Sequence, residues 1–175
     1  MSTNYLIKSI IIGASKTGKS YLLSKFTNGK QKANYQPTVG VEFGSKMLQL
    51  ELKGIIINTL MQIWDTAGAE IYQTITNTYY KGSSVVFIVF DLNNTESFQK
   101  CKFYMENVQQ YCLEDVWKNL TILIGTQLSD ERKVTTDQAL LFAKQNNILY
   151  SELNKDTNVD EILHTMAKRY IQLYE

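Results

Sequence analysis

Apolar and polar stretches alternate along the chain in the order expected for a parallel sheet covered by helices. Short apolar runs that are typical of strands are followed by segments with helical periodicity. Six strands are predicted, at residues 5–12, 39–52, 55–64, 85–90, 120–125 and 148–151. The unbroken apolar run of the fourth indicates a buried central strand. The turn residues Lys53 and Gly54 predict that the second and third strands form an antiparallel hairpin.

The clearest helical patterns lie between and after these strands. One helix is expected to leave a glycine-rich loop at 13–20 and to end near Phe26. A second helix is predicted at 95–114, with Thr95 as its N-cap. Further helices are predicted at 136–145 and 159–173, and the polar segments 27–37 and 65–82 read as loops. The fold class expected is α/β, in three layers, with a six-stranded, mostly parallel sheet, five flanking helices and one domain covering residues 1–175.

Composition and charge exclude several classes of protein. The chain has 175 residues, of which 44% are hydrophobic and 20% charged, with a net charge of +1. Nothing in this balance suggests a nucleic-acid partner or a polybasic membrane patch. Cys101 and Cys112 lie on one predicted helix about 16 Å apart, beyond disulfide reach. Without a CxxC motif, a signal peptide or a membrane span, we expect a reduced, cytoplasmic protein that does not insert into membranes.

The glycine-rich loop carries the strongest chemical signal. Residues 13–20 fit G-x-x-x-x-G-K-[ST] between a strand and a helix, the setting that this motif requires. Glycines let the backbone turn so that amides point at phosphate oxygens, and the helix N-terminus adds a positive dipole. We expect Lys19 to reach the β- and γ-phosphates and the Ser20 hydroxyl to ligate Mg²⁺. The nucleotide contacts expected here are Gly13, Ser15, Lys16, Thr17, Gly18, Lys19, Ser20 and Tyr21.

A second motif, with the sequence D-T-A-G, follows the third predicted strand. The carboxylate of Asp65, at the strand end, suits a Walker-B-type role in which it holds Mg²⁺ directly or through water. Gly68 has no Cβ, so its amide can approach a γ-phosphate. Because this motif lies downstream of a phosphate loop, the two together predict a nucleoside triphosphate site with bound magnesium.

Together these motifs resemble those of the Ras superfamily of small GTPases, whose fold is a P-loop NTPase G domain. Thr38 lies eighteen residues after Ser20, the family spacing for the switch I threonine that completes Mg²⁺ coordination. The stretches 37–43 and 64–82 resemble switch I and switch II of Rab proteins, and the likeness becomes looser after residue 100. The resemblance implies GTP/GDP and Mg²⁺ as cofactors. It also implies effector proteins, a guanine-nucleotide exchange factor and a GTPase-activating protein as partners.

Three aromatic residues fall on the triad that Rab proteins use against effectors: Phe43, Trp64 and Tyr79. Plain packing between strands is the alternative interpretation of these side chains. The chain as given has no cysteine near its end, so it cannot be prenylated there. The resemblance therefore implies a cytoplasmic protein, peripheral to endomembranes only where a longer native chain carries a lipid.

Three positions around the expected nucleotide depart from the family pattern. Ala69 stands where the family has the glutamine that orients the attacking water, which implies slow intrinsic hydrolysis. Gln31 replaces an aromatic residue that packs on the guanine. Lys16 replaces a common glycine, where its charge either adds affinity or crowds the loop.

The base-recognition motifs are altered as well. The family reads guanine with N-K-x-D, or with T-K/Q-x-D in the Rho branch, and here Thr126 and Gln127 resemble the Rho variant. Ser129 occupies the aspartate position, and Asp130 comes one residue late. The final base loop, S-A-K in the family, has no clear match here. The base contacts expected are Thr126, Gln127, Ser129, Asp130, Asn154 and Lys155.

Three functional hypotheses follow. The intact phosphate loop, Thr38 and Asp65 favour a guanine-nucleotide switch in vesicle traffic or signalling that hydrolyses GTP slowly. Ala69, Gln31 and Ser129 favour a pseudo-GTPase, an interaction module that binds nucleotide weakly or without cycling. The altered base loop also permits relaxed base specificity, which competition with ATP would expose.

Overall fold

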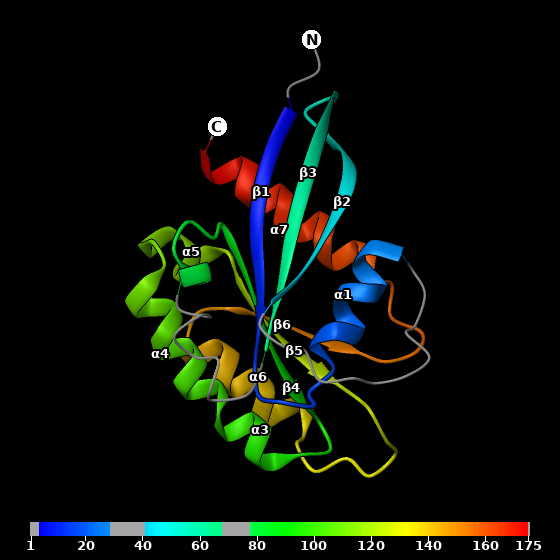
Figure 1. Ribbon diagram of the computed structural model, residues 1–175, viewed down its shortest axis with the longest axis vertical. Helices are drawn as coiled ribbons and strands as arrows, with labels where there is room; N and C mark the ends of the chain where they lie inside the picture. Colours follow the sequence, from blue (N-terminus) through cyan, green and yellow to red (C-terminus); the bar gives the residue numbers. More distant parts are fainter. Residues whose placement is uncertain (1–3, 29–40, 68–77, 175) are drawn as a thin grey trace.

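The computed structural model describes residues 4–28, 41–67 and 78–174 (Figure 1). In these ranges six strands form one sheet in the order β2-β3-β1-β4-β5-β6. They are β1 (Asn4–Ile12), β2 (Val41–Leu52), β3 (Ile55–Thr66), β4 (Val85–Asp91), β5 (Thr121–Thr126) and β6 (Leu149–Leu153). Among these six described strands, β2 and β3 are the one antiparallel pair, as predicted. Lys53 and Gly54 make their turn with φ of 51° and 76°, the positive pair that matches the twist of a hairpin.

Helices cover both faces of the sheet. They are α1 (Lys19–Asn28), α3 (Thr95–Gln99), α4 (Cys101–Tyr111), α5 (Glu114–Asn119), α6 (Thr136–Gln145) and α7 (Val159–Tyr174). Phe87 of β4 packs on Phe26 of α1, with ring centroids 5.2 Å apart. Phe90 packs on Phe98 of α3 at 5.0 Å. Because Phe87 and Phe90 are three residues apart on one strand, they face opposite sides, so α1 and α3 belong to different layers (Figure 1).

The single helix predicted at 95–114 is wrong, and the described ranges hold six helices rather than five. The chain forms α3 and α4, separated at Lys100, and then α5. Cys112 has an extended backbone (φ −95°, ψ 161°), which ends α4. The N-cap of α3 is Asn94 rather than Thr95, since the Asn94 side chain accepts a hydrogen bond from a first-turn amide at 3.2 Å.

The core lies along β4, as its apolar run predicts. Every side chain from Val85 to Phe90 has 0% exposure. Cys101 and Cys112 are both free thiols, as predicted. Burial raises the pKa of both, that of Cys112 to about 12, so both are protonated and unreactive at neutral pH. None of the described helices combines the length and the apolar character needed to cross a bilayer.

The parallel strands gather the loops that carry the motifs. β1, β3, β4, β5 and β6 run in the same direction, so their carboxyl ends meet at one edge of the sheet. The phosphate loop follows β1, and the D-T-A-G motif begins within β3. The two base-recognition segments follow β5 and β6. The fold therefore brings four separate sequence segments to one edge of the sheet.

Candidate functional site

The turn between β1 and α1 depends on two glycines. Gly13 has φ of 146°, and a Cβ there would lie 2.1 Å from the carbonyl oxygen of Val89 on β4. Gly18 has φ of 88°, and a Cβ there would lie 3.3 Å from Cγ2 of Thr126. Side chains at these positions would be strained and, at Gly13, would collide with the sheet. The loop therefore lies tightly against β4 and β5.

Lys16, at the tip of the same loop, occupies a conformation that favours glycine. Its φ is 62°, in the left-handed region, which costs a residue with a Cβ about 1–2 kcal/mol. Ser15 and Lys16 are exposed, whereas Thr17 is buried and its hydroxyl donates to the carbonyl of Ala14 at 2.9 Å. Within the described residues the Lys16 ammonium makes no hydrogen bond or ion pair. Its side chain therefore adds a positive charge at the rim of the loop and does not fill it.

Lys19 is held inside the loop. Its side chain is 6% exposed, and its ammonium donates to the carbonyl of Ala14 at 2.7 Å. Burial lowers the pKa of Lys19 to about 8, and the nearby Asp65 carboxylate opposes part of that shift. An anion bound next to this desolvated ammonium would stabilise its charged form. This position fits the phosphate group that the motif predicts.

Ser20 and Asp65 form the second part of the phosphate site. The Ser20 hydroxyl, at the start of α1, donates to Oδ2 of Asp65 at 2.5 Å. Asp65 is fully buried at the end of β3, next to the buried Thr66. A hydroxyl and a carboxylate are hard oxygen donors, and Mg²⁺ at nucleotide sites takes such ligands with phosphate and water. The donor pair therefore fits a magnesium ion beside the phosphates.

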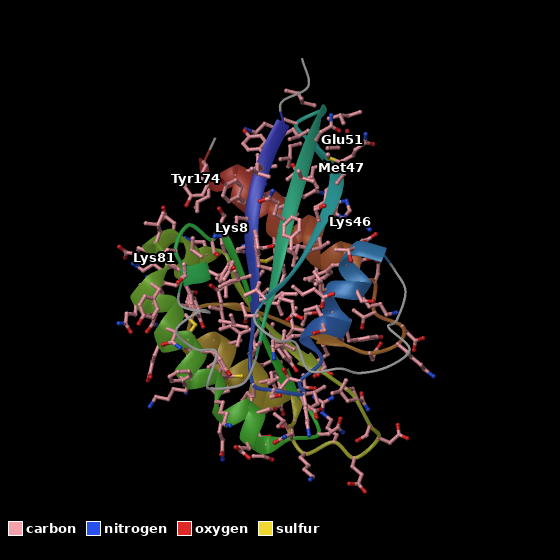
Figure 2. The ribbon with its side chains drawn as sticks, in the orientation of Figure 1. Lys8, Lys46, Met47, Glu51, Lys81 and Tyr174 are labelled. Carbon is pink, nitrogen blue, oxygen red and sulfur yellow. The ribbon has the colours of Figure 1, made fainter. Side chains whose placement is uncertain are left out.

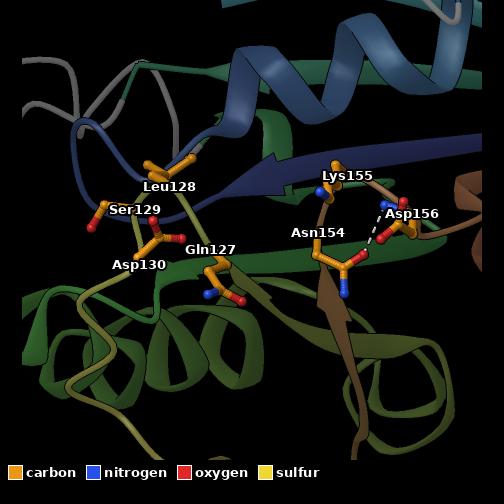
Figure 3. Close-up of a pocket in the computed structure, with 7 residues that line it drawn as sticks. All are labelled: Gln127, Leu128, Ser129, Asp130, Asn154, Lys155 and Asp156. Carbon is orange, nitrogen blue, oxygen red and sulfur yellow. Dashed lines mark hydrogen bonds between the residues drawn. The ribbon is translucent and has the colours of Figure 1, made fainter.

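A pocket of about 370 Å³ lies between the two base-recognition segments (Figure 3). Its lining residues are Gln127, Leu128, Ser129, Asp130, Asn154, Lys155 and Asp156. Five of the six predicted base contacts thus line one cavity. Thr126 does not: it is buried, and its hydroxyl donates to the carbonyl of Thr17 at 2.7 Å. Thr126 therefore joins the base segment to the phosphate loop.

An ion pair connects the two walls of this pocket. Arg132, which follows the first wall, donates to both carboxylate oxygens of Glu152 at 3.0 and 2.6 Å. The hydroxyls of Thr136 and Tyr150 also donate to Glu152, at 2.8 and 2.7 Å. The bonds from Arg132 lower the pKa of Glu152 to about 2. The backbone amide of Gln127 donates to Leu153 across the same gap at 3.1 Å. The width of the pocket is therefore set by fixed contacts.

The predicted aromatic triad forms one cluster on the sheet. Phe43 of β2 lies opposite Trp64 of β3, with ring centroids 4.7 Å apart, and Tyr79 follows Trp64 at 5.2 Å. Lys8 lies on β1 (Figure 2). Its ammonium is 6.0 Å from the centre of the Trp64 ring and 5.8 Å from that of the Tyr79 ring. Phe43 is 49% exposed. The three rings pack on one another and still present an apolar surface.

Comparison with known proteins identifies the family of this chain. The sequence model of the Ras family matches residues 8–172. The chain belongs to the Ras family. Ras-related protein Rab-1 of Theileria parva is 38% identical over 170 residues, covering 94% of this chain and 74% of that protein. GTP-binding protein YPT1 of Saccharomyces cerevisiae is 37% identical over 170 residues, covering 95% and 79%. Within the Ras family the chain is therefore Rab-like, as its motifs predict.

Some predicted positions lie outside the described residues. Thr38, Gly68, Ala69 and Gln31 are among them. Their roles in this Ras-family chain stay predictions. Tyr21 is described, and the ammonium of Lys25 lies 5.6 Å from its ring.

Four contributors to the base pocket were not among the predicted contacts. Leu128 and Asp156 line the pocket. Arg132 joins its walls, and Asn93 binds the first wall from the loop after β4. Asn93 follows a central parallel strand, a position where polar residues meet at the loop edge of such a sheet. That signal was present in the sequence. Nothing in the sequence pairs Arg132 with Glu152, which are 20 residues apart.

Proposed function

We propose that this Rab-like chain is a guanine-nucleotide switch that binds GTP or GDP together with Mg²⁺. The observation that carries the proposal is the buried Lys19 ammonium beside the Ser20–Asp65 pair. It lies at the same sheet edge as a polar pocket of a size suited to a base. A phosphate chain and a base are joined in one molecule, so a nucleotide is the ligand class that uses both parts.

Each residue of the phosphate site has a separate task in this mechanism. The tight backbone at 13–18 directs amides inward, and Lys19 neutralises charge on the β- and γ-phosphates. Ser20 and Asp65 would hold the metal, which would offset phosphate charge. By the family resemblance, Thr38 and Gly68 would contact the γ-phosphate, and loss of that phosphate would release both segments. Phe43, on the strand that follows Thr38, presents this change to an effector.

Hydrolysis by the isolated chain is expected to be slow. Ala69 has no polar atom to orient the attacking water. The missing group is then supplied by a GTPase-activating partner, and an exchange factor reloads the site. The resemblance to Rab proteins supports a role for this cycle in vesicle traffic or signalling. It implies a cytoplasmic protein or, for a longer lipidated chain, one peripheral to endomembranes.

The second candidate is an interaction module that does not cycle. Ala69 and Ser129 favour it, because the first removes a catalytic group and the second a base-reading carboxylate. The two candidates share the phosphate site and differ in turnover and in the response of effectors to the γ-phosphate.

Single-turnover GTP hydrolysis, after a mant-GTP titration with and without excess ATP, tests the proposal. Tight binding that ATP does not compete away, with slow turnover that Ala69→Gln accelerates, is expected of the switch. The Lys19→Ala variant is the control and should bind mant-GTP at least about 100-fold more weakly. Absence of binding at micromolar nucleotide with Mg²⁺ would leave the interaction module.

A further inference from the structure

The side chain of Asn93 is bound at four points to the wall of the base pocket. Asn93 lies after β4, and its Oδ1 accepts hydrogen bonds from the backbone amides of Leu128 and Ser129, both at 3.0 Å. Its Nδ2 donates to the carbonyls of Ser129 at 3.0 Å and Glu131 at 2.7 Å. A side-chain amide offers two acceptor lone pairs and two donor hydrogens. All four are used on this one segment.

These bonds enclose Asp130 in the chain. The bonded groups of Leu128 and Ser129 precede Asp130 in the sequence, and the bonded carbonyl of Glu131 follows it. Asn93 is itself anchored, since its backbone amide donates a hydrogen bond to the Asp91 carboxylate at 2.9 Å. In Figure 3 the Asp130 carboxylate points toward the space between the two walls, whereas the Ser129 hydroxyl points away from it. The fixed backbone therefore decides which of the two side chains faces the pocket.

We propose that Asn93 is a positioning residue for base selection, which holds Asp130, rather than Ser129, toward the base. This inference rests on the proposed function, because it names the residue that orients the base reader of the same site. The segment is one residue out of register with the family motif, and Asn93 stabilises that shifted register. Loss of its four bonds frees the backbone on both sides of Asp130.

The chemistry of a carboxylate then predicts the base. A carboxylate accepts two hydrogen bonds side by side. Guanine presents two adjacent donors, its N1–H and its 2-amino group. Hypoxanthine keeps only the first donor, and xanthine carries an acceptor oxygen in place of the amino group. A site that pairs with both donors rejects the analogues that lack one of them.

The test uses equilibrium binding of GDP, IDP and XDP, measured by displacement of mant-GDP in the presence of Mg²⁺. Asn93→Ala is expected to reduce the preference for GDP over IDP by about tenfold, with a smaller loss of affinity for IDP. Asp130→Asn is expected to lose about 100-fold in GDP affinity and to gain affinity for XDP, because an amide donates to the xanthine oxygen. Asn94→Ala is the matched control. The side chain of this neighbouring asparagine caps α3 and, among the described residues, does not bond to the pocket wall, so the GDP-to-IDP ratio should equal that of the wild type.

The outcomes separate this inference from the function on which it rests. A wild-type protein that binds no nucleotide overturns both. A wild type that prefers GDP, together with an Asn93→Ala variant of unchanged GDP-to-IDP ratio, overturns only the role of Asn93, even if both affinities fall. A loss of GDP preference in Ser129→Ala as large as that in Asp130→Asn overturns the assignment of Asp130.

Discussion

Lys16 and Lys53 share a backbone property and differ in their surroundings. Both have φ in the left-handed region, at 62° and 51°. Glycine adopts this conformation without strain, which stabilises the folded state. Part of that stabilisation is offset because glycine also has more conformational entropy in the unfolded chain. We expect Lys16→Gly and Lys53→Gly each to raise the free energy of unfolding of the nucleotide-free protein by about 0.5 kcal/mol in urea titrations. A loss of stability in either variant would contradict the strain argument.

Nucleotide affinity should distinguish these two variants. Lys16 lies on the phosphate loop, whereas Lys53 lies in the hairpin turn between β2 and β3. Removing the positive charge of Lys16 should weaken mant-GDP binding, since that charge attracts the phosphates. The loss should be only about threefold to tenfold, because the ammonium is exposed and screened by salt. The Lys53 variant should bind as the wild type does. Equal affinity in both variants would mean that the Lys16 charge does not act on the phosphates.

The lowered pKa of Lys19 gives a pH dependence with a defined sign. The folded pKa is about 8, below the ordinary value of 10.5. The unfolded chain therefore binds more protons between these values, and the nucleotide-free protein should become more stable as pH rises from about 8 to 10.5. Nucleotide binding favours the protonated form, so affinity should fall above pH 8, by up to about tenfold per unit.

Fluorescence titrations of mant-GDP between pH 7 and pH 9 would check this. The Lys19→Met variant provides the reference, since any titration of the base itself remains in it. A wild-type profile parallel to that of Lys19→Met would show that Lys19 keeps its proton throughout the range.

Among the structural elements, the loops after β5 and β6 depend on Glu152. Its bidentate bond with Arg132 joins the two walls of the base pocket. Glu152→Gln should lower the free energy of unfolding by about 1–2 kcal/mol and weaken GDP binding, because the walls lose their fixed spacing. The matched control is Glu114→Gln, which breaks an exposed ion pair with Lys118 on α5 and should cost less than about 0.5 kcal/mol.

Acid unfolding provides a second check on Glu152. The folded pKa of about 2 lies below the ordinary value of 4.5, so this carboxylate stabilises the fold above pH 4.5. That contribution should be lost as pH falls toward 2. The difference in stability between the wild type and Glu152→Gln should therefore shrink across that window. A constant difference would mean that packing, rather than charge, explains the effect.

At the scale of the whole molecule, the sequence predicted those features that depend on hydrophobic periodicity or on the local backbone conformation. The apolar run of β4, the hairpin turn at Lys53 and the phosphate loop all depend on neighbouring residues, and each is found where expected. The start of α3 at the Asn94 cap and the end of α4 at Cys112 were missed, because periodicity does not encode a side-chain cap or a change to extended backbone.

The base pocket was predicted only in part for a related reason. Gln127 to Asp130 could be found by motif, since they are contiguous. The contacts of Asn93 with Leu128 and of Arg132 with Glu152 join segments 35 and 20 residues apart, and only the folded sheet brings them together. Which of Ser129 and Asp130 faces the pocket depends on those contacts, so the sequence left that choice open.

Because the site is assembled from the ends of five strands, a ligand bound there should stabilise the whole sheet. Binding to the folded state alone adds about 2.7 kcal/mol when the free ligand is 100 times its Kd. For a domain of this size, that corresponds to a rise in Tm of roughly 5–10 °C. We expect GDP with Mg²⁺ to produce such a shift in calorimetry. Chelation of the metal should reduce this shift, because Ser20 and Asp65 would then lose the ion between them and the phosphates.

ADP at the same concentration should shift Tm by less than about 2 °C if the carboxylate of Asp130 reads guanine. Equal shifts with GDP and ADP would instead favour relaxed base specificity, with the phosphate loop supplying nearly all of the affinity.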